Sequence, residues 1–388
     1  MDNKKKFIFY IVVSLFWFSL YAYVPYVTPY ADEMGTSLRL TGLIAGAYGF
    51  TQMLLRLPLG IFSDKLQRRK IFVQFGLLAA ALSGVLVFFF PSPIMLLVAR
   101  GLGGVAASVW VTLTVLGASY NKGNDTTRVM GQMSAANAFG RMVALLLGGL
   151  AAQVLGVPYA FLLGGIVGVI GLLFGFKLED TPKDENRAPF CMKDFAAVIR
   201  DKQLIFCSVL GILSMYISFS TTFGFTPLAA ARLNASGWQL GLLGVLSTAP
   251  AIFISPIAGG FLPKKIGSAA TLSIGFIIAA LGSLLVAFAD ALWVLFVVQI
   301  SASLGVAIVS TLLLGLCIRD VPEKSRATAM GFFQAVYGIG MFMGPFVTGQ
   351  ISFRFGLSAA FVFTGLIGFC GFLLTLLFAK AAKWKHSR

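Results

Sequence analysis

The feature that most constrains this chain is a series of twelve apolar runs, each near the length that crosses a bilayer. A transmembrane α-helix needs about 20 predominantly apolar residues, and such runs occupy most of the 388 residues. Hydrophobic residues make up 58% of the chain and charged residues only 11%, whereas about a quarter of a globular protein is charged. The sequence therefore predicts an all-α membrane protein. The predicted spans are 7–30, 38–62, 71–90, 94–120, 128–155, 158–177, 204–231, 238–262, 268–289, 291–318, 326–353 and 357–380.

The formal net charge of +16 comes from basic residues that gather on one side of these spans. Only Arg39, Arg232 and Arg354 lie in outer loops, three more arginines lie inside spans, and the remaining 24 of 30 fall on the side of both termini. Cytoplasmic loops carry an excess of Lys and Arg. We therefore predict cytoplasmic termini in a bacterial inner membrane, and we expect the lipid bilayer rather than nucleic acid as the partner.

The two halves of the sequence repeat each other at a nearly fixed offset. Thr28-Pro29 recurs as Thr226-Pro227 after 198 residues, and Gly140 recurs as Gly340 after 200. This pattern indicates a parallel duplication of a six-helix unit, which places a substrate site between the halves near the middle of the membrane. We predict an N-terminal bundle over 1–177, a central cytoplasmic loop over 178–203 and a C-terminal bundle over 204–388.

The segment between the second and third spans carries the most specific motif. Asp64 and Lys65 follow Gly60 at four and five residues, and Arg68 and Arg69 come next. The spacing resembles the signature loop of the major facilitator superfamily, Gly-x-x-x-Asp-Arg/Lys-x-Gly-Arg-Arg/Lys, apart from its second glycine. Asp64 can pair with Arg68 and face the positive N-terminus of a neighbouring helix. We predict that these five residues form a conformational latch that favours the state closed to the cytoplasm.

Two further segments extend the resemblance, which covers essentially the whole chain. Arg100 opens a stretch similar to the family's Arg-x-x-Gln-Gly motif, with Gly103 in place of Gln. The eleventh span holds Gly340, Gly344 and Pro345, and small residues allow close helix approach while a proline permits a bend. The resemblance implies twelve transmembrane helices in two six-helix bundles and a secondary transporter that works by alternating access. We expect a monomer with no enzyme activity and no cofactor, and the cysteines lack metal-ligand spacing.

Three arginines, Arg56, Arg100 and Arg141, fall inside predicted spans of the first half, whereas no carboxylate lies deep within any span. A buried arginine costs several kcal/mol in a membrane unless it faces water, a partner or a ligand. Two interpretations stay open for Arg141 and Arg100: they bind an anionic substrate in the cavity, or they hold helices together through backbone carbonyls and polar side chains such as Asn137. Arg56 precedes Pro58 and is interpreted as structural support for the latch.

The remaining candidates for the substrate site are aromatic or neutral polar residues. Aromatic rings combined with hydroxyls suit a solute with polar and apolar parts. For Trp17 and Tyr21, packing in the helix core is an equally good interpretation. The candidates are Trp17, Tyr21, Trp110 and Asn137 in the first half and Gln334 and Tyr337 in the second.

Three classes of function follow from the sequence. The first is a carrier of an organic anion or amphiphilic anionic metabolite, as the intramembrane arginines indicate. The second is a drug/proton antiporter, which needs a titratable group that only the peripheral Asp32 and Glu33 offer. Either carrier could couple transport to a proton or a counter-ion. The third is a membrane scaffold or receptor, which the lack of a sizeable extramembrane domain disfavours.

Overall fold

The computed structural model describes residues 3–66, 68–120, 126–180, 200–322 and 325–381, and the described residues form helices and connections without a strand. The first half consists of α1 (Asn3–Tyr21), η1 (Val24–Tyr26), α2 (Val27–Glu33), α3 (Leu38–Leu66), α4 (Arg69–Phe89), α5 (Pro93–Ser108), α6 (Trp110–Tyr120), α7 (Thr126–Val154) and α8 (Val157–Gly175). The second half consists of α10 (Lys202–Ser220), η2 (Thr221–Phe225), α11 (Thr226–Arg232), α12 (Gly237–Pro256), η3 (Ile257–Phe261), α13 (Leu262–Ile266), α14 (Ser268–Val286), α15 (Leu292–Arg319), α16 (Arg326–Phe355) and α17 (Leu357–Ala381).

Eleven helical spans in the described ranges are long and apolar enough to cross a membrane. The twelfth, α3, has 29 residues and therefore extends about 44 Å at 1.5 Å per residue. Its apolar run is interrupted by Gln52 and Arg56. The predicted fold of twelve transmembrane helices is confirmed, and each predicted span coincides with one helix or with two or three consecutive helical segments.

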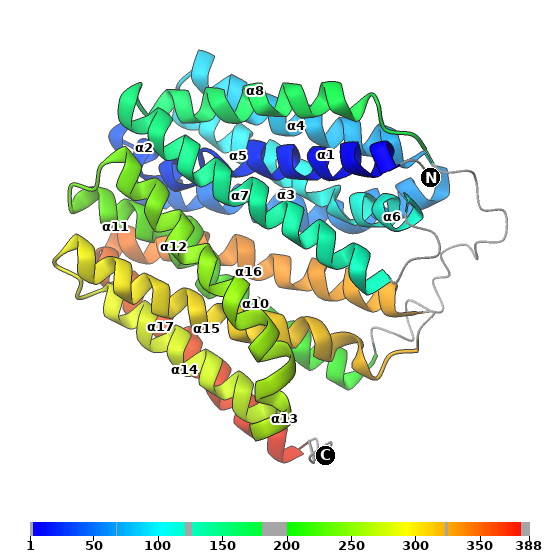
Figure 1. Cartoon of the computed structure of the whole chain (residues 1–388). Helices are drawn as coiled ribbons and strands as arrows, with labels where there is room; N and C mark the ends of the chain where they lie inside the picture. The colour runs from blue at the N-terminus through cyan, green and yellow to red at the C-terminus, as the bar shows by residue number, and fades with distance from the viewer. Residues whose placement is uncertain (1–2, 67, 121–125, 181–199, 323–324, 382–388) are drawn as a thin grey trace.

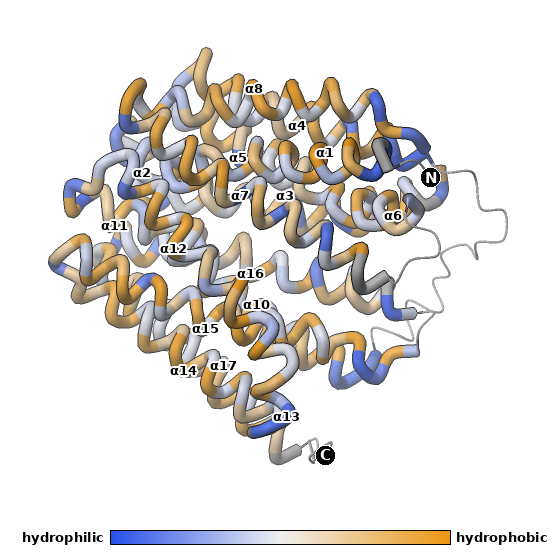
Figure 2. The backbone as a smooth tube through the Cα atoms, viewed as in Figure 1, coloured by the Kyte–Doolittle hydropathy of each residue, from blue (hydrophilic) through white to orange (hydrophobic). Residues whose placement is uncertain are grey.

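The helices run between two ends of the molecule, which we call the terminal end and the hairpin end. The terminal end carries both chain termini and the turn from α3 to α4, and the hairpin end carries the short connections 34–37 and 233–236 (Figure 1). Polar segments gather at the two ends, and apolar segments dominate between them (Figure 2). This distribution is the one expected of a chain whose middle layer lies in hydrocarbon.

Local sequence signals set where several helices begin. Ser236 and Gln239 form a reciprocal capping box at the start of α12, which satisfies backbone N–H groups that have no partner within the helix. Gly156 and Gly356, which are 200 residues apart, precede α8 and α17 with φ angles of 106° and 85°. Glycine is favoured at such angles because it has no Cβ. The duplication seen in the sequence therefore recurs in the turns.

The corresponding glycines of the repeat make corresponding helix contacts. A Cβ on Gly140 would collide with the carbonyl oxygen of Ser14, and a Cβ on Gly340 would collide with that of Ile212. These contacts bring α7 against α1 and α16 against α10. Small residues at such positions let two backbones approach closely, which is how helices associate in membranes.

Both halves interrupt a helix before the repeated Thr-Pro pair. In the first half, a 3₁₀ turn, η1, separates α1 from α2, which contains Thr28. In the second half, a π-helical turn, η2, separates α10 from α11, which begins at Thr226. The second interruption contacts the first half next to η1, because the Thr28 hydroxyl of α2 donates a 2.6 Å hydrogen bond to the carbonyl oxygen of Gly224 in η2.

The halves are closed against each other at the hairpin end. Figure 1 shows α2 and α11 close together there, whereas the two bundles diverge toward the terminal end. The Tyr26 hydroxyl donates to the Gly237 carbonyl at 2.9 Å, and Arg232 forms a 3.0 Å salt bridge with Asp32. Gly149 and Gly241 also lie so close together that a Cβ on Gly241 would stand 2.9 Å from the Cα of Gly149. These contacts, with the one from Thr28, seal one end of the space between the bundles.

The beginning of the predicted central loop is fixed to the terminal end of the first bundle. Lys5 forms a 2.6 Å salt bridge with Glu179, and the Lys70 backbone N–H donates to Asp180 at 2.8 Å. The rest of that loop, 181–199, lies outside the described residues. The predicted limits of the three regions therefore stay predictions.

Candidate functional site

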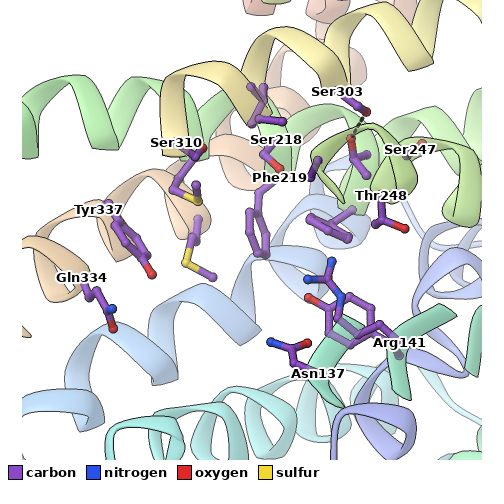
Figure 3. A pocket seen from close by; sticks show the side chains of 18 of the residues that line it. Asn137, Arg141, Ser218, Phe219, Ser247, Thr248, Ser303, Ser310, Gln334 and Tyr337 are labelled. Atoms are coloured by element: carbon purple, nitrogen blue, oxygen red, sulfur yellow. Dashed lines mark hydrogen bonds between the residues drawn. The ribbon is translucent and has the colours of Figure 1, made fainter. Parts of the chain in front are cut away.

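A cavity of about 440 Å³ lies between the two halves. Its first wall comes from α1, α3, α6 and α7, and its second wall comes from α10, η2, α12, α15 and α16. Figure 3 shows Asn137 and Arg141 on one side of this space, with Ser218, Thr248 and other hydroxyl residues across from them. The predicted position of a site between the halves therefore coincides with an actual cavity.

Arg141 is the most prominent polar group of the first wall. Its guanidinium carbon lies 4.2 Å from the centre of the Tyr21 ring and 5.9 Å from that of Phe223 in the second half. Its buried Nε has no hydrogen-bond partner among the described residues, and neither does Oδ1 of Asn137, one helical turn earlier. Cation–π contacts hold the position of the guanidinium. They leave its N–H groups available to an anion.

An aromatic cluster adjoins Arg141. The rings of Trp17 and Trp110 meet edge to face with centroids 5.3 Å apart, and Tyr21 contacts Phe223 edge to face at 5.9 Å. All four residues line the cavity. Nε1 of Trp17 is buried without a partner in the described structure. The cluster provides apolar surface together with an indole donor, which suits an amphiphilic ligand.

Arg56, interpreted from the sequence as support for the latch, lies in the cavity wall instead. It is 4% exposed, and its Nη1 donates a 3.2 Å hydrogen bond to the Tyr337 hydroxyl in the second half. Gln52, one helical turn earlier, also lines the cavity and is 4% exposed. Its Oε1 is buried without a described partner, as is Nε of Arg56. The support role of Arg56 stays a prediction.

The second wall is polar but uncharged. The hydroxyls of Ser247 and Thr248 donate to carbonyl oxygens of their own helix at 2.7 and 3.0 Å. The Thr222 hydroxyl lies 3.3 Å from that of Ser303, and Gln299 donates to Thr222 at 2.7 Å. Gln334 and Tyr337, both predicted from the sequence, line the same cavity. Much of the hydrogen-bonding capacity of this wall is therefore already used within the protein.

Arg100 is not among the residues that line the cavity. It is 3% exposed, and its guanidinium lies 4.8 Å from the centre of the Tyr48 ring. Its positive charge also lies close to the Tyr23 side chain. Because Tyr48 itself faces the cavity, Arg100 lies directly behind the wall. Of the two interpretations offered for this residue, its surroundings favour the structural one.

The described side chains of the predicted latch and the glycines of the eleventh span are not among the residues that line the cavity. Gly60 and Lys65 end α3, and Arg69 begins α4 at the terminal end. The side chain of Asp64 lies outside the described set, so the latch stays a prediction. A Cβ on Gly344 would stand 2.6 Å from the Tyr216 carbonyl oxygen, and Pro345 lies within the continuous helix α16.

Several lining residues were not singled out from the sequence. Tyr48 and Gln52 precede Arg56 by eight and four residues, so one helical face of α3 carries all three. In α15, Ser303 and Ser310 are seven residues apart and share a face in the same way. Polar residues four and eight positions before an intramembrane arginine share its helical face, and this spacing would have identified Tyr48 and Gln52 from the sequence.

Comparison with known proteins decides the family. The model of the Major Facilitator Superfamily matches residues 7–259 and 208–387, which together cover nearly the whole chain and overlap as a duplicated sequence would. This chain is a member of the major facilitator superfamily. It is therefore a multi-pass membrane transporter of a small solute, as its resemblance to the family implied.

Relatives in sequence include transporters of several kinds. An uncharacterised MFS-type transporter of Methanocaldococcus jannaschii is 22% identical over 375 residues, which cover 94% of this chain and 95% of the relative. The class H tetracycline resistance protein of Pasteurella multocida is 25% identical over 346 residues, covering 86% and 83% of the two chains. The MFS transporter is thus similar to one protein whose name gives no substrate and to another that is named for tetracycline resistance.

Solved structures agree on the fold. A bacterial homologue of the human lysosomal transporter Spinster, in an inward-facing and unoccupied conformation, has a TM-score of 0.83 at 15% identity, with both chains fully covered. The human organic anion transporter MFSD10 has a TM-score of 0.68 at 19% identity, covering 97% of this chain and 100% of the other. In this fold, a cavity sealed at one end and placed between the repeats is where solute binds during alternating access.

Proposed function

We propose that this transporter carries an organic anion across the cytoplasmic membrane, and that Arg141 binds the acidic group of that anion. The observation that supports the proposal is the charge of the cavity, since the described residues that line it include Arg56 and Arg141 but no carboxylate. A guanidinium in a low-dielectric site is stabilised by a carboxylate or phosphate that accepts hydrogen bonds from it. An anionic solute supplies the partner that the lining residues lack.

The depth of Arg141 supports its assignment to a transport site. It lies 15 residues from the start of α7 and 13 from its end, which is about 20 Å from either end of the helix. Transporters with repeated halves bind their substrates near the bilayer midplane. Arg141 also touches Phe223 of the second half, so a bound anion would lie where both halves can reach it.

The orientation in the membrane forms part of the proposal. The excess of Lys and Arg at the terminal end supports cytoplasmic termini, and a relative that is 25% identical is an inner membrane transport protein of Escherichia coli. The contacts at the hairpin end would then close the outer side. The cavity within a single chain supports a monomeric carrier, which could couple transport to a proton or a counter-ion.

Binding and counterflow measurements test the role of Arg141. The purified protein is screened by thermal shift against carboxylate, phosphate and sulfonate metabolites, because a ligand that binds the folded state raises its apparent stability. The ligands found are then used for counterflow in proteoliposomes. We expect Arg141→Ala to weaken binding by about tenfold to a hundredfold, the range for hydrogen bonds to a charged group. We expect Arg141→Lys to restore part of that loss.

The matched control is Arg39→Ala, which removes an exposed arginine that packs on Phe353 outside the cavity. It should leave binding and counterflow unchanged. The assignment of Arg141 is wrong if both Arg141 variants bind and transport every ligand as the parent protein does. Stabilisation by cationic or neutral compounds only would reject the anion carrier itself.

A drug/proton antiporter is the second candidate, and the tetracycline resistance relative favours it. The aromatic cluster around Trp17 and Trp110 could bind an amphiphilic drug. The carboxylates nearest the seal are Asp32, which pairs with Arg232, and the exposed Glu33. Drug resistance conferred by expression of the protein, and abolished by Glu33→Gln, would support this function. Unchanged drug susceptibility would speak against it.

A further inference from the structure

The second arginine of the cavity has surroundings that differ from those of Arg141. Arg56 lies ten residues from the end of α3, about 15 Å from the terminal end. Its single hydrogen bond to a described residue goes to a neutral hydroxyl, that of Tyr337. Nε of Arg56 and Oε1 of Gln52 are buried on the same helical face, and each lacks a described partner. This group forms a polar site that Arg141 does not belong to.

The two arginines lie at different places along the cavity. Figure 3 shows Tyr337, the hydrogen-bond partner of Arg56, together with Gln334 at one end of the view, and Asn137 and Arg141 toward the other. Phe219 lies between these two groups, and Met215 and Met341 also line the cavity. The cavity therefore has two polar sites, each with one guanidinium, and an apolar surface between them.

The charge of the lining decides what such a cavity binds best. A solute with one acidic group would neutralise one guanidinium and leave the other uncompensated in the membrane, where an unpaired charge is costly. A solute with two acidic groups would neutralise both. A second acidic group at Arg56 would also accept hydrogen bonds from the Tyr337 hydroxyl, which belongs to the opposite half.

We propose that the preferred substrates are amphiphilic dianions, with one acidic group accepting hydrogen bonds from Arg141 and the Nδ2 group of Asn137, and the other from Arg56, the Nε2 group of Gln52 and the Tyr337 hydroxyl. This inference rests on the proposed function and specifies its substrate class. The apolar middle of the solute lies against Phe219 and the neighbouring methionines. Substrates with two acidic groups at opposite ends of a flat or extended hydrocarbon frame meet these requirements.

Matched pairs of ligands test the proposal. Terephthalate is compared with benzoate, a naphthalene dicarboxylate with naphthoate, and alkane dicarboxylates of increasing length with the monocarboxylates of equal length. The measured quantity is the ratio of the two dissociation constants within each pair, obtained by calorimetry or thermal shift on the purified protein. We expect the parent protein to prefer the dianion of the best length by about tenfold or more, the effect of one added charged hydrogen bond.

Variants of Arg56 test whether the preference for dianions arises from the polar site around Arg56. In Arg56→Gln the affinity for the dianion should fall to that for the monocarboxylate, so that the preference disappears, and Arg56→Lys should retain part of it. In Arg141→Gln both members of a pair should bind more weakly. Because a ratio of affinities is measured, a lower yield of folded Arg56→Gln protein does not alter the result, and Arg39→Gln serves as the charge-matched control.

Three results would overturn the inference. The parent protein could bind mono- and dicarboxylates equally, the preference could persist in Arg56→Gln, or Arg56→Gln could weaken both members of a pair by the same factor. In each case, binding of monocarboxylates that depends on Arg141 would leave the proposed anion carrier intact. If no anion of either kind binds, the carrier of organic anions and the dianion preference both fail.

Discussion

The two walls of the cavity come from corresponding parts of a duplicated unit, yet they differ in charge. The first wall presents Arg56 and Arg141 together with buried polar atoms of Trp17, Gln52 and Asn137 that lack described partners. The second wall presents hydroxyl and amide groups, many of which already bond to backbone or to each other. The duplicated framework is thus kept in both halves, whereas the groups that face the solute have diverged.

The shared framework reflects the packing that folding requires, whereas the different cavity linings reflect what solute binding requires. Gly140 and Gly340 occupy equivalent positions and would meet equivalent carbonyl oxygens if they carried a Cβ. Backbone contacts of this kind tolerate no larger side chain in either half, so both glycines are retained. No such packing constraint acts on a side chain that faces a cavity. The lining can therefore change in one half alone.

The largest expected effect is a loss of stability when the glycines repeated in both halves are substituted. Gly140→Ala and Gly340→Ala each force a methyl group against a backbone carbonyl, and overpacking of this kind costs about 1–3 kcal/mol. The two variants should lower the apparent melting temperature in detergent by similar amounts. Gly131→Ala, where nothing lies within 4 Å, is the control and should be neutral or slightly stabilising. A large loss in one half with none in the other would show that the framework is unequal.

The repeated threonines should differ from each other. Thr28 donates to the Gly224 carbonyl across the halves, whereas the buried hydroxyl oxygen of Thr226 has no described partner. Thr28→Val should lower stability by about 1 kcal/mol, and Thr226→Val should change it by less than about 0.5 kcal/mol or raise it. Thermal unfolding of the two variants measures this difference. Equal losses would mean that Thr226 makes an equivalent bond.

Substituting one polar residue in each wall shows which wall contributes more to anion binding. Asn137→Ala removes the side-chain amide of a cavity residue one turn from Arg141, whose Nδ2 group can donate to an anion, and it should weaken anion binding by about fivefold, near the value of one hydrogen bond. Thr248→Val removes a hydroxyl that already donates to Gly244, so its effect on affinity should stay below about twofold. Calorimetry with the best anion of the screen gives both numbers. Larger losses from Thr248→Val would assign recognition to the second wall.

The smallest effect is expected for the salt bridge at the hairpin end. The side chains of Arg232 and Asp32 remain 45% and 33% exposed, and ion pairs at such positions contribute about 0.2–1 kcal/mol. Arg232→Gln should therefore lower the melting temperature only slightly, and 1 M salt should remove the difference because the pair is screened. The exchanged pair Arg232→Asp with Asp32→Arg should recover the parent stability. A large loss would make this pair a main element of the seal.

The sequence was sufficient to predict the number, order and approximate ends of the helices, because apolar length is set by the thickness of the bilayer. It also predicted that Trp17, Tyr21, Trp110, Asn137 and Arg141 lie in or near a central site, since they fall inside spans of the first half. Whether they surround a single cavity depends on how the helices cross in space, and the structure shows that they do. Periodicity alone does not provide that information.

Other features depended on contacts between distant segments. Arg56 was interpreted from its neighbour Pro58, but its position is explained by Tyr337, which is 281 residues away. For Arg100 the sequence left a binding and a structural interpretation open, and the structure places it beside Tyr23 and Tyr48, behind the wall. The interruptions at η1 and η2 were not predicted either. Their residues continue the apolar pattern of the helices on both sides.

The central claim is that charge is recognised by the first half, and a ligand pair that differs only in charge tests it most directly. Naphthoate and its neutral amide, naphthamide, are bound to the parent protein, Arg141→Gln and Thr248→Val, and the ratio of their dissociation constants is measured. We predict that the parent protein and Thr248→Val prefer the anion by about tenfold and that Arg141→Gln loses this preference. An unchanged preference in Arg141→Gln would contradict the account.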